Sequence, residues 1–322
     1  MLQRLAARRR GRSAARAQEH VRRIGVFLTI AADDPETHDR MAAFRQGLET
    51  LGWTEGRNIR FDYWFATGDP ARATTYAAEL VDRSPDLILA NGHAILAAVL
   101  QQTHTIPVVF VGVPDPVVDG FVESLSRSGN NLTGFTNFEF SMASKWLQIL
   151  RELVPNVTRV ALLFNPETEP YVKAFTNAIE AAAQPYQTAL VATPVHDPRD
   201  LEEAIATFAR QPDAGMIVAP GLFTAGHHEL IVGLANDHQL PTVYPFRYFA
   251  AKGGLISYGV DQVDLFRRAA PYADRILRGV RPTDLPIQQP TKFELVINLK
   301  TAKTLGLNIP QRLLYTADEV IE

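Results

Sequence analysis

Short runs of aliphatic residues alternate along this chain with amphipathic helical segments, and the same series occurs twice. The runs lack the polar alternation of a half-exposed strand, so they indicate strands buried on both faces, as in a parallel sheet covered by crossover helices. The predicted strands are 24–28, 59–65, 87–90 and 108–111 in the first series, and 160–164, 189–192, 215–219 and 242–244 in the second. The predicted helices are 41–51, 76–81, 94–101, 172–183, 201–209 and 230–236. The repeat predicts an α/β fold of two Rossmann-like lobes with parallel sheets.

Two such lobes would bind a ligand between them, because parallel sheets bind ligands beyond the carboxyl ends of their strands. Turn-forming residues and glycines mark the predicted hinge crossings at 126–136 and 253–260. Asp261 then caps a predicted helix over Val263–Leu277, which would return to the first lobe. The expected domains are a first lobe of 22–134 with 261–285, a second lobe of 135–260, and an apolar segment, 286–322, that packs on a lobe or on the hinge.

Charge is unevenly distributed along the chain. Residues 1–23 carry eight arginines and one glutamate, a formal +7 within the total of −3, so the remainder carries −10. A surface that acidic repels phosphate backbones, so nucleic acid is not an expected partner.

Residues 1–21 are predicted to be a disordered tail or a signal-peptide remnant. Ala14–Gln18 has the small-residue pattern of a cleavage site, but no apolar stretch of about 7–15 residues precedes it. No other stretch approaches the roughly 18 apolar residues of a membrane span, so no stable membrane insertion is expected.

The sequence motifs of common enzymes are absent. There is no glycine-rich phosphate loop of either common type, no G-x-S-x-G elbow and no H-E-x-x-H pair. The chain has no cysteine, and the side chains of the adjacent His227 and His228 would point in different directions on a helix. We therefore expect no catalytic residue, no cofactor and no metal ligand.

Polar residues and glycines stand where the predicted strands of the first lobe end. Asn91, Gly92 and His93 would expose backbone N–H groups at a helix N-terminus, a favourable position for a carboxylate, or they only make the turn. Asp115, between two prolines, would pair with a ligand amine or hydroxyl, or it is only a turn former. Thr29, at the end of the first strand, completes the candidates from this lobe.

Aromatic residues dominate the corresponding loops of the second lobe. Tyrosine and phenylalanine offer flat apolar faces, which suit an aromatic or amphipathic small molecule. The alternative is that Phe246, Tyr248 and Phe249 simply fill the lobe interface, and that Arg247 forms a local salt bridge rather than clamping a carboxylate. The candidate ligand-binding residues from this lobe are Asn165, Tyr171, Gly221, Leu222, Phe223, Tyr244, Arg247 and Tyr258.

Several blocks of sequence are more specific than the strand and helix pattern. They include Arg23-Ile-Gly-Val26, Phe44-Arg-Gln-Gly-Leu48, Ile106-Pro-Val-Val-Phe110, Asn131-Leu-Thr-Gly134, Gly253-Gly-Leu-Ile-Ser-Tyr-Gly259 and the run from Gln289 to Ala302. Together they closely resemble the ABC-transporter substrate-binding proteins of the tryptophan/tyrosine type, over about residues 22–322. The resemblance implies the type I periplasmic-binding fold, a periplasmic location, ABC permease subunits as partners, and the aromatic amino acids that better-known members bind.

The predicted function is the solute-binding component of an ABC importer. It would act as a monomer and capture a small organic ligand, either an aromatic amino acid or an aromatic or apolar carboxylate. The alternative is the ligand-sensing domain of a regulator or receptor with the same fold, which would need a helix-turn-helix ahead of Ile24. An enzyme on this scaffold, with Asp115 as its base, is a third alternative.

Overall fold

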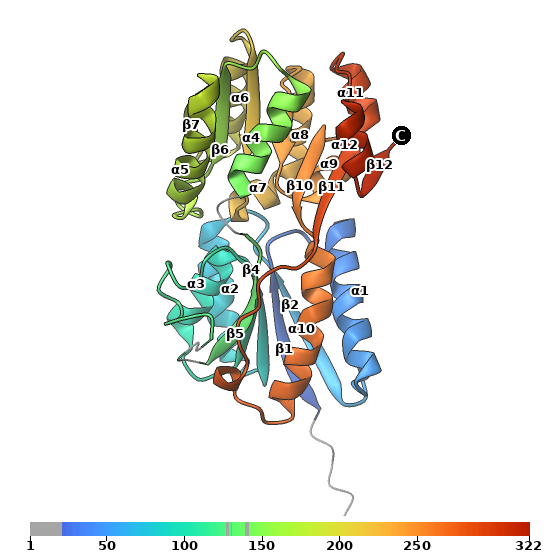
Figure 1. Cartoon of the computed structure of the whole chain (residues 1–322). Helices are drawn as coiled ribbons and strands as arrows, with labels where there is room; N and C mark the ends of the chain where they lie inside the picture. The colour runs from blue at the N-terminus through green and yellow to red at the C-terminus, as the bar shows by residue number, and fades with distance from the viewer. Residues whose placement is uncertain (1–20, 127–128, 130, 139–141) are drawn as a thin grey trace, which may run out of the picture.

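The computed structural model describes residues 21–126, 129, 131–138 and 142–322. Within these residues, two α/β lobes lie one above the other, each built on its own sheet (Figure 1). The predicted tail, 1–21, lies outside the described residues apart from Val21. The fold is therefore the pair of Rossmann-like lobes that the repeated pattern predicts.

The first lobe contains a five-stranded, fully parallel sheet with the strand order β2-β1-β3-β4-β5. Its strands are β1 (Arg22–Leu28), β2 (Ile59–Phe65), β3 (Leu87–Asn91), β4 (Val108–Val113) and β5 (Leu132–Thr136). The inner strands β3 and β4 are buried along their whole length, which confirms the prediction for them. Strand β2, at one edge of the sheet, is partly exposed and so departs from that prediction.

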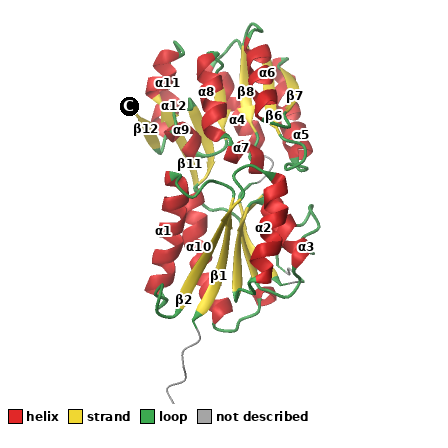
Figure 2. Ribbon diagram, turned by 180° about the vertical axis from the view of Figure 1, so that it is seen from behind, coloured by secondary structure: helices red, strands yellow, loops and turns green. Residues whose placement is uncertain are grey.

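Helices cover both faces of this sheet. One face carries α2 (Pro70–Asp82) and α3 (His93–Gln102), and the other carries α1 (Pro35–Thr50) and α10 (Gln262–Leu277) (Figure 2). Helices α1 and α10 pack closely because Gly47 lies against Ala270: a Cβ atom added to Gly47 would lie 2.6 Å from that of Ala270. The second half of the chain thus supplies a helix to the first lobe.

Aspartate side chains cap three of the helices, and the cap predicted at Asp261 is confirmed. Asp69 accepts hydrogen bonds from the first turn of α2, and Asp197 does the same for α6 (Pro198–Ala209). Asp261 accepts a hydrogen bond from the backbone N–H of Asp264 at the start of α10. In each case the carboxylate satisfies an N–H group that has no partner within the helix.

The second lobe contains a seven-stranded sheet with the order β12-β11-β10-β9-β8-β6-β7, parallel except between β10 and β11. Its strands are β6 (Arg159–Phe164), β7 (Ala189–Pro194), β8 (Ala214–Val218), β9 (Thr242–Tyr244), β10 (Ile256–Val260), β11 (Phe293–Asn298) and β12 (Glu319–Ile321). Its helices are α4 (Met142–Leu153), α5 (Val172–Ala183), α6, α7 (Leu222–Gly226), α8 (His228–Asp237), α9 (Arg247–Ala251), α11 (Leu299–Thr304) and α12 (Gln311–Thr316). The apolar C-terminal segment therefore extends this sheet through β11 and β12.

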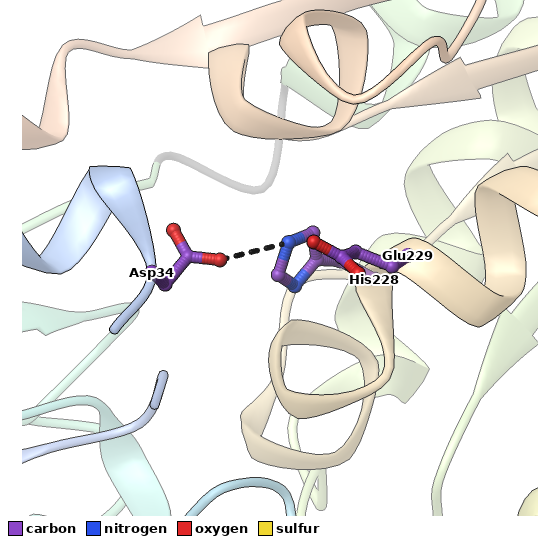
Figure 3. Close-up of side chains that lie close together, drawn as sticks. All are labelled: Asp34, His228 and Glu229. Carbon is purple, nitrogen blue, oxygen red and sulfur yellow. Dashed lines mark ion pairs between the residues drawn. The ribbon is translucent and has the colours of Figure 1, made fainter. Parts of the chain in front are cut away.

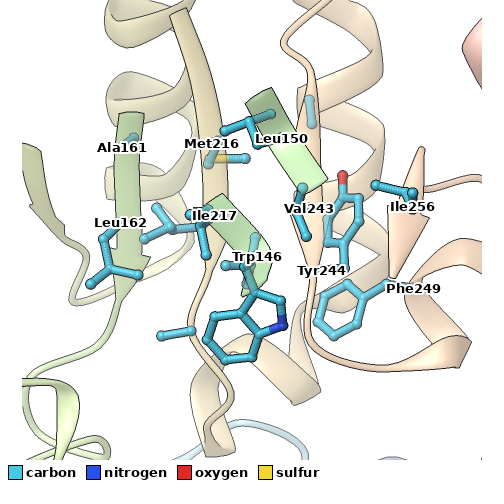
Figure 4. Packing of buried hydrophobic residues seen from close by; sticks show 14 of the residues in the cluster. Trp146, Leu150, Ala161, Leu162, Met216, Ile217, Val243, Tyr244, Phe249 and Ile256 are labelled. Atoms are coloured by element: carbon cyan, nitrogen blue, oxygen red, sulfur yellow. The ribbon is translucent and has the colours of Figure 1, made fainter. Parts of the chain in front are cut away.

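Trp146 of α4 anchors the core of the second lobe. Its side chain is fully buried beside Leu150 of the same helix and faces the sheet near Ile217 and Val243 (Figure 4). The indole N–H donates a 2.7 Å hydrogen bond to the carbonyl oxygen of Tyr258. A buried indole needs such a partner, and this one fixes α4 against β10.

The chain crosses between the lobes after β5, after β10 and before β11. The predicted crossing at 126–136 is wrong in its second part, since Leu132–Thr136 form β5 and are completely buried. Residues 127, 128 and 130 of that segment lie outside the described residues. The predicted crossing at 253–260 likewise contains strand β10, and the chain leaves the second lobe only after it.

Candidate functional site

A cavity lies between the two lobes, where the carboxyl ends of the two sheets face each other. The space that the centre of a water molecule can occupy in it is about 40 Å³, so the two lobes are nearly closed on this cavity. The first lobe and its crossings contribute Thr29, Arg40, Asn91, Gly92, His93, Gly112, Pro114, Asn137 and Gln262. The second lobe contributes Tyr171, Pro220, Gly221, Leu222, Ala225, Phe246 and Tyr248. This is the position in which open α/β sheets bind ligands.

Among the described residues that line the cavity, Arg40 alone has a guanidinium group, and it is almost completely buried. Its Nε donates to the Glu36 carboxylate at 2.8 Å, and its Nη1 donates to Asn91 Oδ1 at 3.2 Å. The same Asn91 oxygen accepts a hydrogen bond from the Thr29 hydroxyl at 3.0 Å. The guanidinium carbon also lies 5.4 Å from the ring centre of Tyr248, across the lobe interface. Arg40 is not among the residues predicted from sequence. The signal that could have indicated it is its i, i+4 spacing from Glu36 in the first turns of a helix.

The N-terminus of α3 faces the same cavity. Gly92 is its N-cap with φ +90°, and no side chain caps the helix. The glycine is required there, since a Cβ atom would be strained at this φ and would lie 3.1 Å from the Thr29 methyl group. His93 is fixed by a 2.9 Å contact between its Nδ1 and Asp119 Oδ2. Asn91 and Gly92 therefore have two roles, since they form the turn before α3 and also line the cavity.

Two buried amide side chains of the cavity each leave one polar atom unpaired among the described residues. Gly112, with φ +76°, lies at an irregularity of β4, and a Cβ atom there would meet the side chains of Asn91, Asn137 and Gln262 at 3.3–3.5 Å. Among the described residues, Asn137 Oδ1 and Gln262 Nε2 have no hydrogen-bond partner. Asn137 follows β5 and Gln262 begins α10, so both lie on segments that join the lobes. One acceptor and one donor are thus available to a ligand.

Aromatic side chains form the wall from the second lobe. Phe246 and Tyr248 stack with ring centres 5.6 Å apart, and the Tyr171 hydroxyl donates to the Pro220 carbonyl at 2.9 Å. Burial raises the pKa values of Tyr171 and Tyr248, so both phenols remain neutral. The alternative of interface filling holds for Phe249, which is fully buried in the core, but Phe246 and Tyr248 line the cavity.

The structure brings seven of the predicted site residues to the cavity: Thr29, Asn91, Gly92, His93, Tyr171, Gly221 and Leu222. Six others do not line it. Asp115 Oδ1 accepts hydrogen bonds from Val117 N and Val118 N, at 3.1 and 3.0 Å, and so acts as a turn former. Arg247 is held by Glu319 of β12 through contacts of 2.7 and 2.9 Å, which is the local salt bridge of the alternative interpretation.

The other four are retained by packing within the second lobe. Tyr244 is 1% exposed and stacks on Phe249 with ring centres 5.1 Å apart. Asn165 donates to the Val195 carbonyl and accepts from Thr168. The rings of Phe223 and His227 pack 4.3 Å apart, and those of Tyr258 and Phe293 stack at 6.4 Å. Tyr244 and Tyr258 lie within strands β9 and β10, Asn165 directly follows β6, and Phe223 lies in α7. None of these four side chains lines the cavity.

A buried carboxyl group lies directly behind the cavity wall. Glu169 is completely buried, and burial raises its pKa to about 8, so it is protonated at neutral pH. A Cβ atom added to Gly221 would lie 1.6 Å from Glu169 Oε1. Glycine is therefore needed at position 221, because any side chain there would overlap the Glu169 carboxyl group.

The parallel sheets and the inter-lobe cavity define the type I periplasmic-binding architecture of solute-binding proteins. Residues 24–321 match the family described as ABC transporter substrate binding protein, and the chain belongs to that family. A tyrosine-binding protein of Clostridioides difficile (strain R20291) is 24% identical over 282 residues, which are 88% of this chain and 81% of the relative.

Two solved structures share the fold over nearly the whole chain. A conserved domain protein of Vibrio cholerae O1 biovar eltor is 27% identical, with a TM-score of 0.85, covering 93% of this chain and 99% of the other. An ABC domain from Streptococcus pneumonia in complex with L-Trp is 23% identical, with a TM-score of 0.84 and the same coverage. In the part of the chain that the structure describes, no helix combines the length and apolar character that crossing a bilayer requires.

Proposed function

We propose that this chain captures an aromatic amino acid, or an aromatic or apolar carboxylate, in the inter-lobe cavity and delivers it to ABC permease subunits. The observation that carries the proposal is the asymmetry of the cavity. Its first-lobe side holds Arg40 and the free N-terminus of α3, whereas its second-lobe side holds Phe246, Tyr248 and Tyr171. Such a cavity suits a molecule with an anionic end and a flat apolar body.

The charges around the cavity favour an anionic group on the ligand. Of the described residues that line it, none carries a carboxylate, and Arg40 is the one side chain with a permanent charge. Glu36 offsets that charge from outside the lining, but the α3 N–H groups still favour a carboxylate. The proposed contacts are Arg40 and the seven predicted residues Thr29, Asn91, Gly92, His93, Tyr171, Gly221 and Leu222.

The unpaired amides favour an amino acid over a simple carboxylic acid. Gln262 Nε2 can donate to a carboxylate, but Asn137 Oδ1 needs a donor, and leaving a buried polar atom unpaired costs about 1–3 kcal/mol. An α-ammonium group supplies that donor. Two of the similar proteins support an aromatic amino acid, since one is a tyrosine-binding protein and the other is in complex with L-Trp.

The remaining parts of the proposal follow from membership of the family. The chain would act as a monomer outside the cytoplasm, in the periplasm, and would bind its solute without transforming it. Binding would close the lobes about the three crossings and present the closed shape to the permease. A sensor role is less favoured, because the matched family is that of transporter substrate-binding proteins.

A ligand panel tests the proposal. Purified protein is mixed with L-tryptophan, L-tyrosine, L-phenylalanine and their deaminated acids, and unfolding is followed by a thermal-shift assay. A ligand held at 100 times its Kd stabilises the protein by about 2.7 kcal/mol, so the melting temperature should rise by several degrees. Titration calorimetry then gives the affinity. The proposed ligand class would be contradicted if sugars raised the melting temperature and none of the aromatic compounds did.

A further inference from the structure

Three potential metal ligands meet at the lobe interface, away from the solute cavity. Asp34 precedes α1 of the first lobe, whereas His228 and Glu229 begin α8 of the second lobe (Figure 3). One ligand atom from each lies within 4.8 Å of the others. The distance between His228 Nε2 and Asp34 Oδ2 is 3.3 Å. These side chains come together only when the lobes are in contact.

The orientation of His228 leaves one ring nitrogen unused. Its Nδ1 lies 2.7 Å from the Ala225 carbonyl oxygen, which can only accept, so Nδ1 carries the proton. Its Nε2 is buried, and the structure gives it no hydrogen-bond partner among the described residues, although it points at Asp34. A histidine whose second nitrogen donates to a backbone carbonyl is typical of a metal ligand, because the carbonyl fixes the tautomer.

Asp34 is oriented in a similar way. Its Oδ1 accepts a 2.8 Å hydrogen bond from the Glu36 backbone N–H as the cap of α1, which directs Oδ2 toward His228. Two atoms bound about 2.1 Å from one tetrahedral ion lie about 3.4 Å apart, close to the separation found here. Both residues are buried, so the side chains are held in this arrangement.

A lysine ammonium group already occupies part of this cluster. Lys252 Nζ lies 2.5 Å from Glu229 Oε1 and 4.0 Å from Asp34 Oδ2. The side chains of Lys252 and Glu229 are 30% and 63% exposed, and an ion pair this exposed contributes little to stability, so an ion can displace the lysine. A surface pocket lined by Asp33, Asp34, His228, Glu229 and Lys252 gives an ion access.

We propose that Asp34, His228 and Glu229 form a binding site for a divalent transition-metal ion of the Zn²⁺ class, which bridges the closed lobes. One imidazole and two carboxylates suit Zn²⁺ better than Mg²⁺ or Ca²⁺, and water completes the tetrahedron. Because the ligands come from both lobes, the ion binds the closed form and stabilises it. An ion pair between a protonated His228 and Asp34, with no metal, is the competing explanation.

Zn²⁺ alone tests the site, without any solute. The melting temperature is measured with ZnCl₂ and with EDTA, and the affinity by calorimetry. Zn²⁺ should raise the melting temperature of the parent protein. His228→Gln and Asp34→Asn, one from each lobe, should each weaken binding by about tenfold or more. Asparagine can still cap α1, so Asp34→Asn should fold normally.

Two further variants separate the site from chance binding. Lys252→Met removes the competing ammonium group and should tighten Zn²⁺ binding several-fold. His196→Gln alters an exposed histidine beside Glu167 and should leave the response unchanged. The proposal is overturned if neither the parent nor Lys252→Met responds to Zn²⁺, which is the ion-pair result. It is also overturned if the response survives both Asp34→Asn and His228→Gln.

Discussion

Gly68 of the first lobe and Gly226 of the second lobe meet with no room for a side chain between them. A Cβ atom added to Gly226 would lie 2.3 Å from the backbone nitrogen of Gly68 and 2.4 Å from its Cα. Gly68 has φ +81°, and a Cβ atom there would lie 2.8 Å from His227 Cε1. The backbones of the two lobes are therefore in direct contact at this edge of the cleft.

Gly226→Ala should weaken solute binding without unfolding the protein. The backbone of Gly226 does not have the positive φ that would exclude alanine, so the added methyl group obstructs only the closed form. We expect at least a tenfold loss of affinity for the tightest ligand of the aromatic panel, measured by calorimetry. Gly233→Ala in α8 is the matched control, because its Cβ atom would meet nothing within 4 Å. Equal affinities in the two variants would show that closure tolerates the methyl group.

Arg40→Lys should reduce affinity for carboxylate ligands by about tenfold while changing stability little. Lysine keeps a positive charge beside the buried Glu36 but loses the planar fork that reaches Asn91. Arg45→Lys on the same helix is the control, since that guanidinium lies over Tyr63 away from the cavity. Calorimetry with one aromatic ligand compares the two, and an unchanged Kd for Arg40→Lys would remove Arg40 from the site.

The repeated pattern predicted most of the fold because burial on both faces leaves a clear aliphatic signature. It missed β5, since Leu132–Thr136 contains glycine and two threonines and resembles a turn. Those threonines are buried all the same, and Thr133 Oγ1 donates to the Leu285 carbonyl, a partner far along the chain. Sequence pattern alone does not show such a partner.

The candidate site was predicted only where backbone geometry determines it. Asn91–His93 follow a strand and begin a helix, so their position at the cavity follows from the fold. The direction of an aromatic side chain depends on packing, which is why Tyr244 lies in the core and Phe246, two residues later, lines the cavity. Arg247 resembled a ligand clamp because Glu319, its partner, is 72 residues away.

Asn137→Leu should abolish the preference for amino acids over their deaminated acids. The isosteric leucine removes the unpaired acceptor that an α-ammonium group would use. We expect the Kd of the amino acid to rise by about tenfold or more and that of the matching acid to change less than about threefold. Calorimetry with L-phenylalanine and 3-phenylpropionate measures both. If the parent protein binds the two equally, the amide does not recognise an ammonium group, whereas binding of neither would contradict the proposed ligand class.

Glu169 should make the protein less stable as the pH rises toward 8. Its pKa is about 8 in the fold and 4.5 as the reference value, so between these values the folded state holds a proton that the unfolded chain has released. The contribution of this group is fully present below pH 4.5 and falls by up to about 1.4 kcal/mol per pH unit as the pH approaches 8. Glutamine cannot ionise, so the free energy of unfolding of Glu169→Gln should not show this fall. The difference between the variant and the parent at pH 5 is the reference, and from there to pH 8 it should change steadily in favour of the variant. Urea unfolding across this range measures the difference, with the exposed Glu180→Gln variant as the control that should follow the parent. If the Glu169→Gln and parent curves ran parallel from pH 5 to 8, the buried carboxyl group would not hold its proton.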